Sequence, residues 1–543
     1  MLSSLRNNLR HWQFFLLLLV PILATAILLW LLGKNSPAAS ENNLDVVKDS
    51  TLLAPPPAHR RETKTVEPDS DTMPSQTAEQ SPTAVSDELD SQIHIIQLQR
   101  AEDYWRMMDW ASANGFRITG QIPRLFTIRL ALSDEEYRRL HHDSGLEFTE
   151  ETEVFVSIPD QLLDKYPEWI GNPGPAFGTS YQDYLGVDTA DTERGHGIII
   201  ALLDTALLPH SEFDNASLTK VARRNNGEPA ATGTSDHGTA VASILTSLSN
   251  ASILAYEVLG GETDSGSAFD LANAIVDAVD RGADIISMSL GTYSDSAILQ
   301  NAIDYALEKQ VIVVAAAGNN GVEEVCYPAA YDGVLAVGAI DANGNVSGFS
   351  NSGEEISLVA PGVGLLAATY DDEYAYFSGT SAAVPCVSAV LANYLAENPN
   401  ADILDAYMAL LQNCNDTEAP GKDTLSGFGI LDAERLAAQT ATGIRDAAAA
   451  GITLEGNTLT VSAQNTGTVL LEQLVLTTKI NGIELQNTFD DVAPGTVVSA
   501  QGEVPEELLN GALPLAIRTT VFTPGVTDTR PRNQSHIQTF GEH

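Results

Sequence analysis

Between residues 175 and 440 the chain alternates short, almost wholly apolar runs with longer alanine-rich segments. A strand that is apolar on both faces must be shielded from water on both. Helices that connect successive parallel strands pack on the two faces of the sheet and provide this shielding. We therefore predict a doubly wound α/β domain with a mostly parallel sheet, and a functional site at the carboxyl ends of its strands. The predicted strands are residues 197–204, 251–259, 283–290, 311–318 and 333–340, with helices at 267–282 and 296–310.

Residues 91–158 have a different pattern, with strands and helices in the order β-α-β-β-α-β. This order is that of the small ferredoxin-like α+β sandwich. A capping box formed by Ser133 and Glu136 marks the start of the second helix. The predicted elements are a strand at 93–99, a helix at 101–115, two strands within 116–132 and a last strand within 146–157.

Residues 450–543 alternate apolar and polar residues, which is typical of strands with one buried face. The pair Asn481-Gly482 is a hairpin signal. We predict an Ig-like β-sandwich here, a fold that supports a spacer or a binding module.

Residues 14–32 carry no charge and would form a helix about 28 Å long, enough to span a bilayer. Arg6 and Arg10 precede this run, so the N-terminus is expected to stay in the cytoplasm. The alternative is a cleaved signal peptide with its small-residue site at 24–26. Because that site lies inside the apolar run, we favour an uncleaved anchor formed by residues 1–34.

Residues 35–90 are rich in Pro, Ser, Thr and acidic residues without periodicity, and are predicted to be a disordered linker. With either reading of the N-terminus, the rest of the chain is expected outside the cytoplasm in the cell envelope. The sequence leaves open whether it stays anchored or is released.

The chain has 72 acidic and 28 basic residues, a net charge of −44. Such an excess repels nucleic acid and anionic membrane surfaces, so neither is an expected partner and membrane contact is expected only through the N-terminal helix. The three cysteines, Cys326, Cys386 and Cys414, are too few for a disulfide framework, and no Cys-x-x-Cys metal spacing occurs. One bridge or three buried thiols are compatible with the sequence, and we favour thiols.

Four polar residues stand where an α/β site is expected: Asp204 ends a predicted strand, His237 and Ser381 begin predicted helices, and Asn319 follows a strand. Taken singly, each has an ordinary reading as a turn, cap or packing residue. Together they match the needs of a serine nucleophile, which requires a base and a carboxylate that orients the base. A helix N-terminus and a carboxamide would stabilise the oxyanion that follows attack.

The segments that contain these residues resemble those of the subtilisin-like serine proteases, also called subtilases or peptidase family S8, which use the chain order Asp, His, Ser. A further stretch, SGFGILDAERLA, is similar to the segment that closes catalytic domains of this family. The matching segments are ALLDTALLPHSEF, SDHGTAVASIL, IISMSLG, VVAAAGNN, YPAAYDGVLAVGAI, SNSGEEISLVAPG and SGTSAAVP.

The resemblance implies a serine endopeptidase that acts on protein or peptide substrates and is made as a self-processed zymogen. By position, Asp204 orients the imidazole, His237 is the general base and then acid, and Ser381 attacks the scissile carbonyl. Asn319 and the backbone N–H of Ser381 would form the oxyanion hole. No cofactor is required; structural calcium is common in the family, but its ligands cannot be assigned in this sequence.

The family binds its substrate as an added β-strand. By resemblance, Cys326 lies near the floor of the primary specificity pocket, and a small apolar group there is expected to favour medium-sized apolar P1 side chains over bulky or basic ones. Residues 91–158 resemble the inhibitor-I9-like propeptide of the family, an inhibitor that is cut off between about Val156 and Gly178. The residues that would bind the substrate backbone are Ser289, Leu290, Gly291, Ala315, Ala316, Ala317 and Gly318.

The sequence departs from the family pattern in a few places. Ala206 stands where the family usually has Gly, and would be strained if that position needs a positive φ. Ala382 replaces a usual Met, and Val384-Pro385-Cys386 replaces Ser-Pro-His. We expect Pro385 in the first turn of its helix, where N–H groups need no intrahelical partner.

Two rival functions remain. A pseudoprotease would keep the fold and the peptide groove without chemistry, and an envelope adhesion or scaffold protein would depend on the C-terminal domain. The scaffold would keep its function after Ser381→Ala, whereas a protease would lose both maturation and cleavage. A metal-dependent hydrolase is disfavoured because the sequence has no His-Glu-x-x-His.

Overall fold

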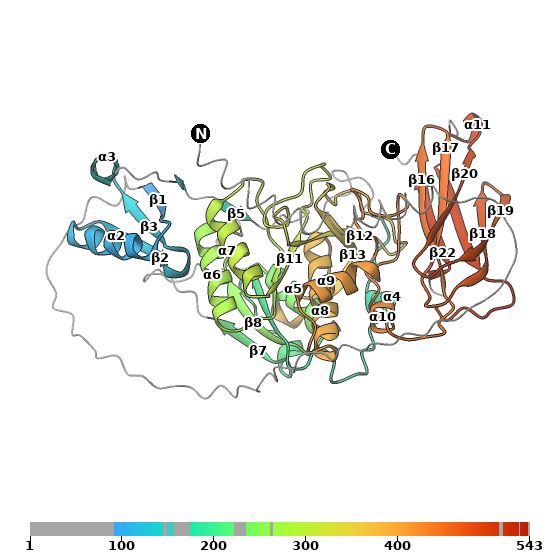
Figure 1. Cartoon of the computed structure of the whole chain (residues 1–543), viewed down its shortest axis with the longest axis horizontal. Coiled ribbons are helices and arrows are strands. Elements are labelled where there is room, and N and C mark those ends of the chain that lie inside the picture. Colours follow the sequence, from blue (N-terminus) through green and yellow to red (C-terminus); the bar gives the residue numbers. More distant parts are fainter. Residues whose placement is uncertain are drawn as a thin grey trace, which may run out of the picture. The chain divides into compact units, whose positions relative to one another are not determined.

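The computed structural model describes residues 92–144, 149–150, 153–155, 174–221, 235–260, 264–509, 514–530 and 533–540 (Figure 1). The apolar run at 14–32, the linker at 35–90 and most of the interval predicted for the maturation cut lie outside these residues. Within the part of the chain that is described, no helix is both long and apolar enough to cross a membrane.

A seven-stranded parallel sheet forms the centre of the α/β domain, with strand order β13-β12-β11-β10-β6-β8-β7, which confirms the predicted sheet. The strands are β6 (Ile199–Asp204), β7 (Leu218–Val221), β8 (Ser252–Glu257), β10 (Ile285–Met288), β11 (Ile312–Ala316), β12 (Leu335–Ile340) and β13 (Ile356–Pro361). After β13 the chain forms a separate two-stranded antiparallel ribbon from β14 (Leu365–Ala368) and β15 (Tyr374–Phe377).

Helices cover both faces of this sheet, as a doubly wound fold requires. Successive residues of β6 show why: Ile200 and Leu202 belong to the apolar cluster that includes α5 and α8, whereas Ala201 and Leu203 belong to the cluster that includes α6 and α7. The helices are α4 (Tyr181–Leu185), α5 (His237–Leu248), α6 (Ala268–Asp280), α7 (Ala297–Glu308), α8 (Thr380–Glu397), α9 (Ile403–Gln412) and α10 (Ala433–Ala437).

The N-terminal segment forms an antiparallel sheet with strand order β2-β3-β1-β4, and two helices in the order expected. At the start of α3, the Ser133 N–H donates to Glu136 Oε2 over 2.9 Å, and the Glu136 N–H donates to Ser133 Oγ over 3.4 Å, so the capping box is present. The elements are β1 (Gln92–Gln97), α2 (Ala101–Ala113), β2 (Arg117–Ile122), β3 (Thr127–Leu132), α3 (Asp134–Ser144) and β4 (Thr149–Glu150).

The single last strand predicted within residues 146–157 is wrong, because the chain divides there between two sheets. The strand β4 pairs with β1, whereas β5 (Glu153–Phe155) pairs antiparallel with β9 (Ser265–Ser267), which directly precedes α6. The N-terminal segment thus sends its last described strand onto the α/β domain.

The C-terminal region consists of two antiparallel sheets, β16-β17-β20 and β19-β18-β21-β22, around a shared apolar cluster. The predicted hairpin at Asn481-Gly482 joins β18 to β19, and both turn residues have positive φ. The Ig-like topology stays a prediction. The elements are β16 (Ala447–Glu455), β17 (Thr458–Asn465), β18 (Leu471–Ile480), β19 (Ile483–Val492), β20 (Val497–Glu503), α11 (Glu506–Leu509), β21 (Leu515–Phe522) and β22 (Ser535–Phe540).

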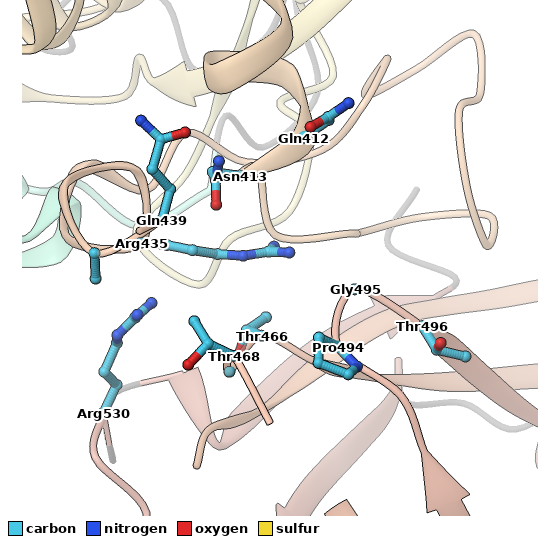
Figure 2. Close-up of a pocket in the computed structure, with 12 residues that line it drawn as sticks. Gln412, Asn413, Arg435, Gln439, Thr466, Thr468, Pro494, Gly495, Thr496 and Arg530 are labelled. Carbon is cyan, nitrogen blue, oxygen red and sulfur yellow. The ribbon is translucent and has the colours of Figure 1, made fainter. Parts of the chain in front are cut away.

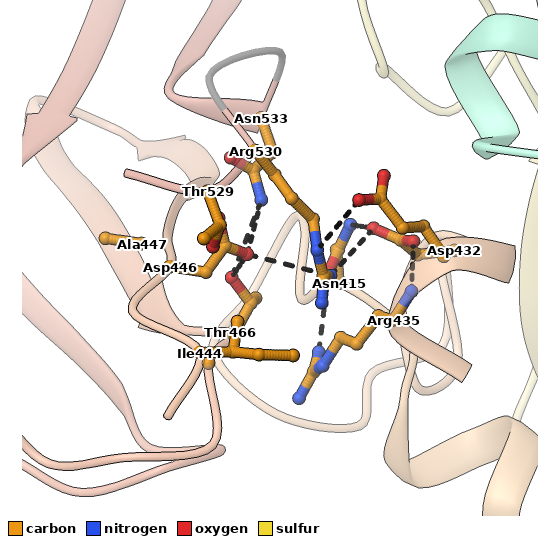
Figure 3. A network of polar contacts seen from close by, with 12 residues as sticks. Asn415, Asp432, Arg435, Ile444, Asp446, Ala447, Thr466, Thr529, Arg530 and Asn533 are labelled. Carbon is orange, nitrogen blue, oxygen red and sulfur yellow. Dashed lines mark hydrogen bonds and ion pairs between the residues drawn. The ribbon is translucent and has the colours of Figure 1, made fainter. Parts of the chain in front are cut away.

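A buried polar network joins this region to the end of the α/β domain (Figure 3). The Arg530 side chain, 3% exposed, has a nitrogen 3.8 Å from Asp432 and 3.7 Å from Asp446. The Arg435 guanidinium donates to the carbonyl of Cys414 and to Gln464. Both arginines also line a cavity of about 720 Å³ (Figure 2). Buried charges need partners, and in this network each part supplies partners for charges of the other.

Asp416 lies in the same junction, and the pH dependence of stability tests what burial of its carboxylate costs. Its Oδ1 accepts from the Gly421 N–H, its Oδ2 has no partner, and burial raises the pKa of the carboxyl to about 7. The unfolded chain loses this proton near pH 4, so the free energy of unfolding falls as pH rises from about 4 to about 7.

We expect Asp416→Asn to raise the free energy of unfolding by about 1–3 kcal/mol at pH 8, and by much less at pH 4.5. The measurement is urea unfolding at both pH values in the Ser381→Ala background, which prevents self-digestion. Asp332→Asn, at an exposed carboxylate, is the matched control. An equal gain at both pH values would show that Asp416 carries no raised pKa.

Candidate active site

Asp204 and His237 meet at the carboxyl edge of the sheet, where β6 ends and α5 begins. His237 Nδ1 donates to Asp204 Oδ1 over 2.7 Å, and the two residues are only 3% and 1% exposed. Nε2 of His237 is buried without a hydrogen-bond partner. Since the proton sits on Nδ1, Nε2 is the end of the ring that can accept one.

The loop after β6 and the first turn of α5 fit closely together. Thr205 Oγ1 accepts from the Gly238 N–H over 2.9 Å, which satisfies a first-turn donor of α5. A Cβ at Gly238 would lie 2.5 Å from the Thr205 carbonyl and 3.2 Å from Asp204 Oδ1, so only glycine allows this approach. The φ of Ala206 is not positive, and the strain considered for its methyl group does not arise.

Ser381 lies in the first turn of α8, which follows Gly379 with its φ of 131°. Asn319, just beyond β11, caps this helix: its Oδ1 accepts from the Thr380 N–H over 2.8 Å and from the Thr380 hydroxyl over 2.9 Å. These two bonds orient the carboxamide so that Nδ2 is its donor end. Asn319 and the N-terminus of α8 are therefore held together beside Ser381.

Ser289 and Ser381 exchange hydrogen bonds. The Ser381 hydroxyl donates to the Ser289 carbonyl over 3.3 Å, and the Ser289 hydroxyl donates to the Ser381 carbonyl over 2.9 Å. The second bond has a clear cause. Pro385, four residues on, has no N–H to give, so the Ser381 carbonyl lacks its helical partner.

The prediction that Pro385 lies in the first turn is wrong, because α8 begins at Thr380 and the proline falls in the second turn. The hydrogen bond from the Ser289 hydroxyl to the Ser381 carbonyl is a contact that the sequence analysis missed. The four-residue spacing between Ser381 and Pro385 was the available signal, because a proline at this position cannot donate the helical hydrogen bond to the Ser381 carbonyl.

The two predicted substrate-binding edges lie at neighbouring strands: Ser289, Leu290 and Gly291 follow β10, whereas Ala315 and Ala316 are the last residues of β11, and Ala317 and Gly318 follow them. One edge is already paired: the Phe155 N–H donates to the Gly291 carbonyl over 2.9 Å, and the Gly291 N–H donates back to Phe155 over 2.8 Å. Phe155 belongs to β5, whose other side pairs with β9. Val154 of the same strand is fully buried in the cluster with Leu271 of α6. A strand from the N-terminal segment therefore lies between Gly291 and β9.

The three cysteines are buried free thiols, as favoured from the sequence. Burial raises the pKa of Cys326 to about 11 and that of Cys414 to about 12. Cys386 faces its own helix, 3.5 Å from the Ala382 carbonyl. Among the residues described, no group of three or more His, Cys, Asp or Glu could hold a metal ion. Calcium therefore remains without assigned ligands.

The structure thus brings Asp204 and His237 into contact, joins Ser381 to Ser289 and Asn319 to Thr380, and places all of them at the ends of β6, β10 and β11. The catalytic and binding roles assigned to these residues remain predictions.

Residues 195–429 match the family model described as "Subtilase family". M-protease of Shouchella clausii is 34% identical over 250 residues, which are 44% of this chain and 64% of that protein, just under two thirds of its length. Subtilisin Savinase of Lederbergia lenta is 34% identical over 44% of this chain and 90% of its own. The prenylagaramide maturation protease PagA, a solved structure, has 31% identity over 45% of this chain and 94% of its own, with a TM-score of 0.40. Since Subtilisin Savinase is covered over most of its length, the chain belongs to the subtilase family of serine proteases.

Proposed function

We propose that this chain is a serine endopeptidase that hydrolyses peptide bonds through an acyl-enzyme. The observation that carries the proposal is the 2.7 Å bond between buried Asp204 and His237, which leaves the buried Nε2 of His237 without a partner. The pair lies at the same sheet edge as Ser381. A serine hydroxyl becomes an effective nucleophile only with such a base.

In the proposed reaction the Ser381 hydroxyl turns from the Ser289 carbonyl to His237 Nε2, gives up its proton and attacks the peptide carbonyl. The oxyanion accepts from the Ser381 backbone N–H and from Asn319 Nδ2. His237 then returns the proton to the leaving amine, and the C–N bond breaks. A water molecule repeats the sequence on the ester and releases the acid.

The chain is proposed to be made as a zymogen with residues 91–158 as its propeptide and inhibitor. The support is β5, which lies where the family places an added substrate strand: Phe155 pairs with Gly291 and Val154 is fully buried. In an antiparallel pair, each residue further along one strand lies opposite a residue correspondingly earlier in the other strand. Two steps from Gly291 reach Ser289, so the bond expected to be cut is the one after Ser157, which ends the propeptide one residue before the predicted bound of 158.

Residues 1–34 are proposed to anchor the enzyme in the membrane, with the α/β domain at 175–440 outside the cytoplasm and the C-terminal region at 450–543 as a spacer or binding module. The net charge of −44 and the apolar run at 14–32 support export.

Maturation is tested with the full chain and its Ser381→Ala variant. Purified wild type is expected to lose its N-terminal segment and to begin at Ile158 by N-terminal sequencing, within the predicted interval from Val156 to Gly178. Ser381→Ala is expected to stay intact, because it lacks the nucleophile. A trace of mature wild type should restore the cut in the variant at the same bond.

Processing of pure Ser381→Ala at that bond without added enzyme would contradict self-processing. Wild type that stays intact and hydrolyses no peptide would favour the pseudoprotease.

The positioning role of Ser289 is tested by a double-mutant cycle with Pro385. Ser289→Ala leaves the buried Ser381 carbonyl without a donor, and is expected to lower kcat by about 10- to 100-fold with little change in KM. Pro385→Ala supplies the missing N–H, so Ser289→Ala should cost clearly less in that background. Steady-state kinetics of the four mature enzymes give the coupling.

Ser388→Ala is the matched control, since Ser388 lies on the same helix and its hydroxyl donates to Ser287 instead. If the effects of Ser289→Ala and Pro385→Ala on kcat were strictly additive, the Ser289 hydroxyl would not compensate for the N–H that Pro385 lacks.

A further inference from the structure

The floor of the space between the two substrate-binding edges is built from one segment. The Cys326 N–H donates to the Ala317 carbonyl over 2.9 Å, on one edge. The next residue, Tyr327, exchanges two hydrogen bonds of 2.8 Å with Thr292, which directly follows the other edge. Cys326 is therefore held between the two predicted substrate-binding edges.

The Cys326 side chain touches both edges. A Cβ added at Gly291 would lie 2.9 Å from Cys326 Cβ, and one added at Gly318 would lie 2.7 Å from Cys326 Sγ. Cys326 itself is 0% exposed. Since interiors are packed to near crystal density, little room remains at this depth for a further side chain.

A hydrogen-bonded bridge lies beside Cys326, with Asn351 buried, Tyr293 half-buried and Asn320 exposed. The Tyr293 hydroxyl donates to Asn320 Oδ1 over 2.7 Å and accepts from Asn351 Nδ2 over 2.9 Å. Asn351 Oδ1 in turn accepts from the Asn320 N–H over 2.9 Å. Tyr293 continues one edge and Asn320 continues the other, so this Tyr293–Asn320–Asn351 bridge ties them together.

The bridge also packs against the floor. Asn351 is 0% exposed, and its Nδ2 lies 3.9 Å from Cys326 Sγ. A Cβ at Gly318 would lie only 2.3 Å from that same nitrogen. Burial raises the pKa of Tyr293 to about 12 and that of Cys326 to about 11, so both groups are neutral at pH 7.

We propose that Cys326 and the Tyr293–Asn320–Asn351 bridge restrict the P1 side chain to Gly, Ala, Ser or Cys, an inference that rests on the proposed endopeptidase function. The sequence alone suggested medium-sized apolar residues at this position, and the packing around Cys326 replaces that expectation with smaller side chains. The residue before the proposed maturation cut, Ser157, has the expected size.

The test uses the mature enzyme and internally quenched peptides that differ only at P1, which is Gly, Ala, Ser, Leu, Phe or Lys. The kcat/KM for Ala or Ser is expected to exceed that for Leu, Phe and Lys by at least about 100-fold, because a methylene that does not fit costs 10- to 200-fold. Cys326→Gly is expected to raise the Leu-to-Ala ratio of kcat/KM by about 10-fold or more.

Tyr293→Phe removes only the bridging hydroxyl and is expected to raise the same ratio several-fold. Tyr305→Phe, which removes a surface hydroxyl bonded to Asp280, is the control and should leave the ratio unchanged. Since the wild-type ranking is itself a readout, the test does not depend on the variants folding.

A wild-type enzyme that prefers Leu, Phe or Lys at P1 would overturn the inference and leave the proposed function standing. No hydrolysis of any peptide by folded, processed protein would overturn the proposed function, and the inference with it. An unchanged ratio in folded Cys326→Gly and Tyr293→Phe would remove these residues as its determinants.

Discussion

The hydrogen bond between His237 and Asp204 depends on more of the fold than any other contact in the site. It joins the end of β6 to the start of α5 over 2.7 Å, with both groups buried. Water is excluded because β6 is covered on both faces, by α5 and α8 on one and α6 and α7 on the other. Gly238 lets the two elements approach, and Thr205 caps the helix that carries the imidazole. In such a dry site a hydrogen bond between oriented groups is stronger than in water.

Ser381, the proposed nucleophile, is held by a second set of contacts that compensate for one another. Pro385 removes a helical hydrogen bond below Ser381, and the Ser289 hydroxyl replaces it. Asn319 closes the first turn of α8 through Thr380. Ser289 and Asn319 follow adjacent strands, so the sheet itself sets the distance between the proposed substrate edge and the proposed oxyanion donors. The same two strands lead to the Tyr293–Asn320–Asn351 bridge, which links the proposed P1 restriction to the geometry of the nucleophile.

The parallel sheet could be predicted because strands buried on both faces must be apolar throughout, a local property of the sequence. The candidate site could be predicted because its residues stand at strand ends and helix starts within segments that resemble one family. The division of residues 146–157 between β4 and β5 could not, since an alternating run does not say which sheet each half joins. The contact of Tyr293 with Asn351 spans 58 positions; Asn351 lies in one of the matching segments, but Tyr293 does not, and no pattern pairs the two. Contacts of this kind are decided by packing, not by local pattern.

The central claim is that Asp204, His237 and Ser381 act as one catalytic unit. The most direct measurement is the rate at which a fluorophosphonate labels the processed protein, with the adduct located by mass spectrometry. The account predicts a single adduct on Ser381, formed on the order of 10³–10⁴ times more slowly in Asp204→Asn, whose imidazole is no longer held in the right tautomer. An adduct on another residue, no adduct in folded protein, or an unchanged rate in Asp204→Asn would contradict it.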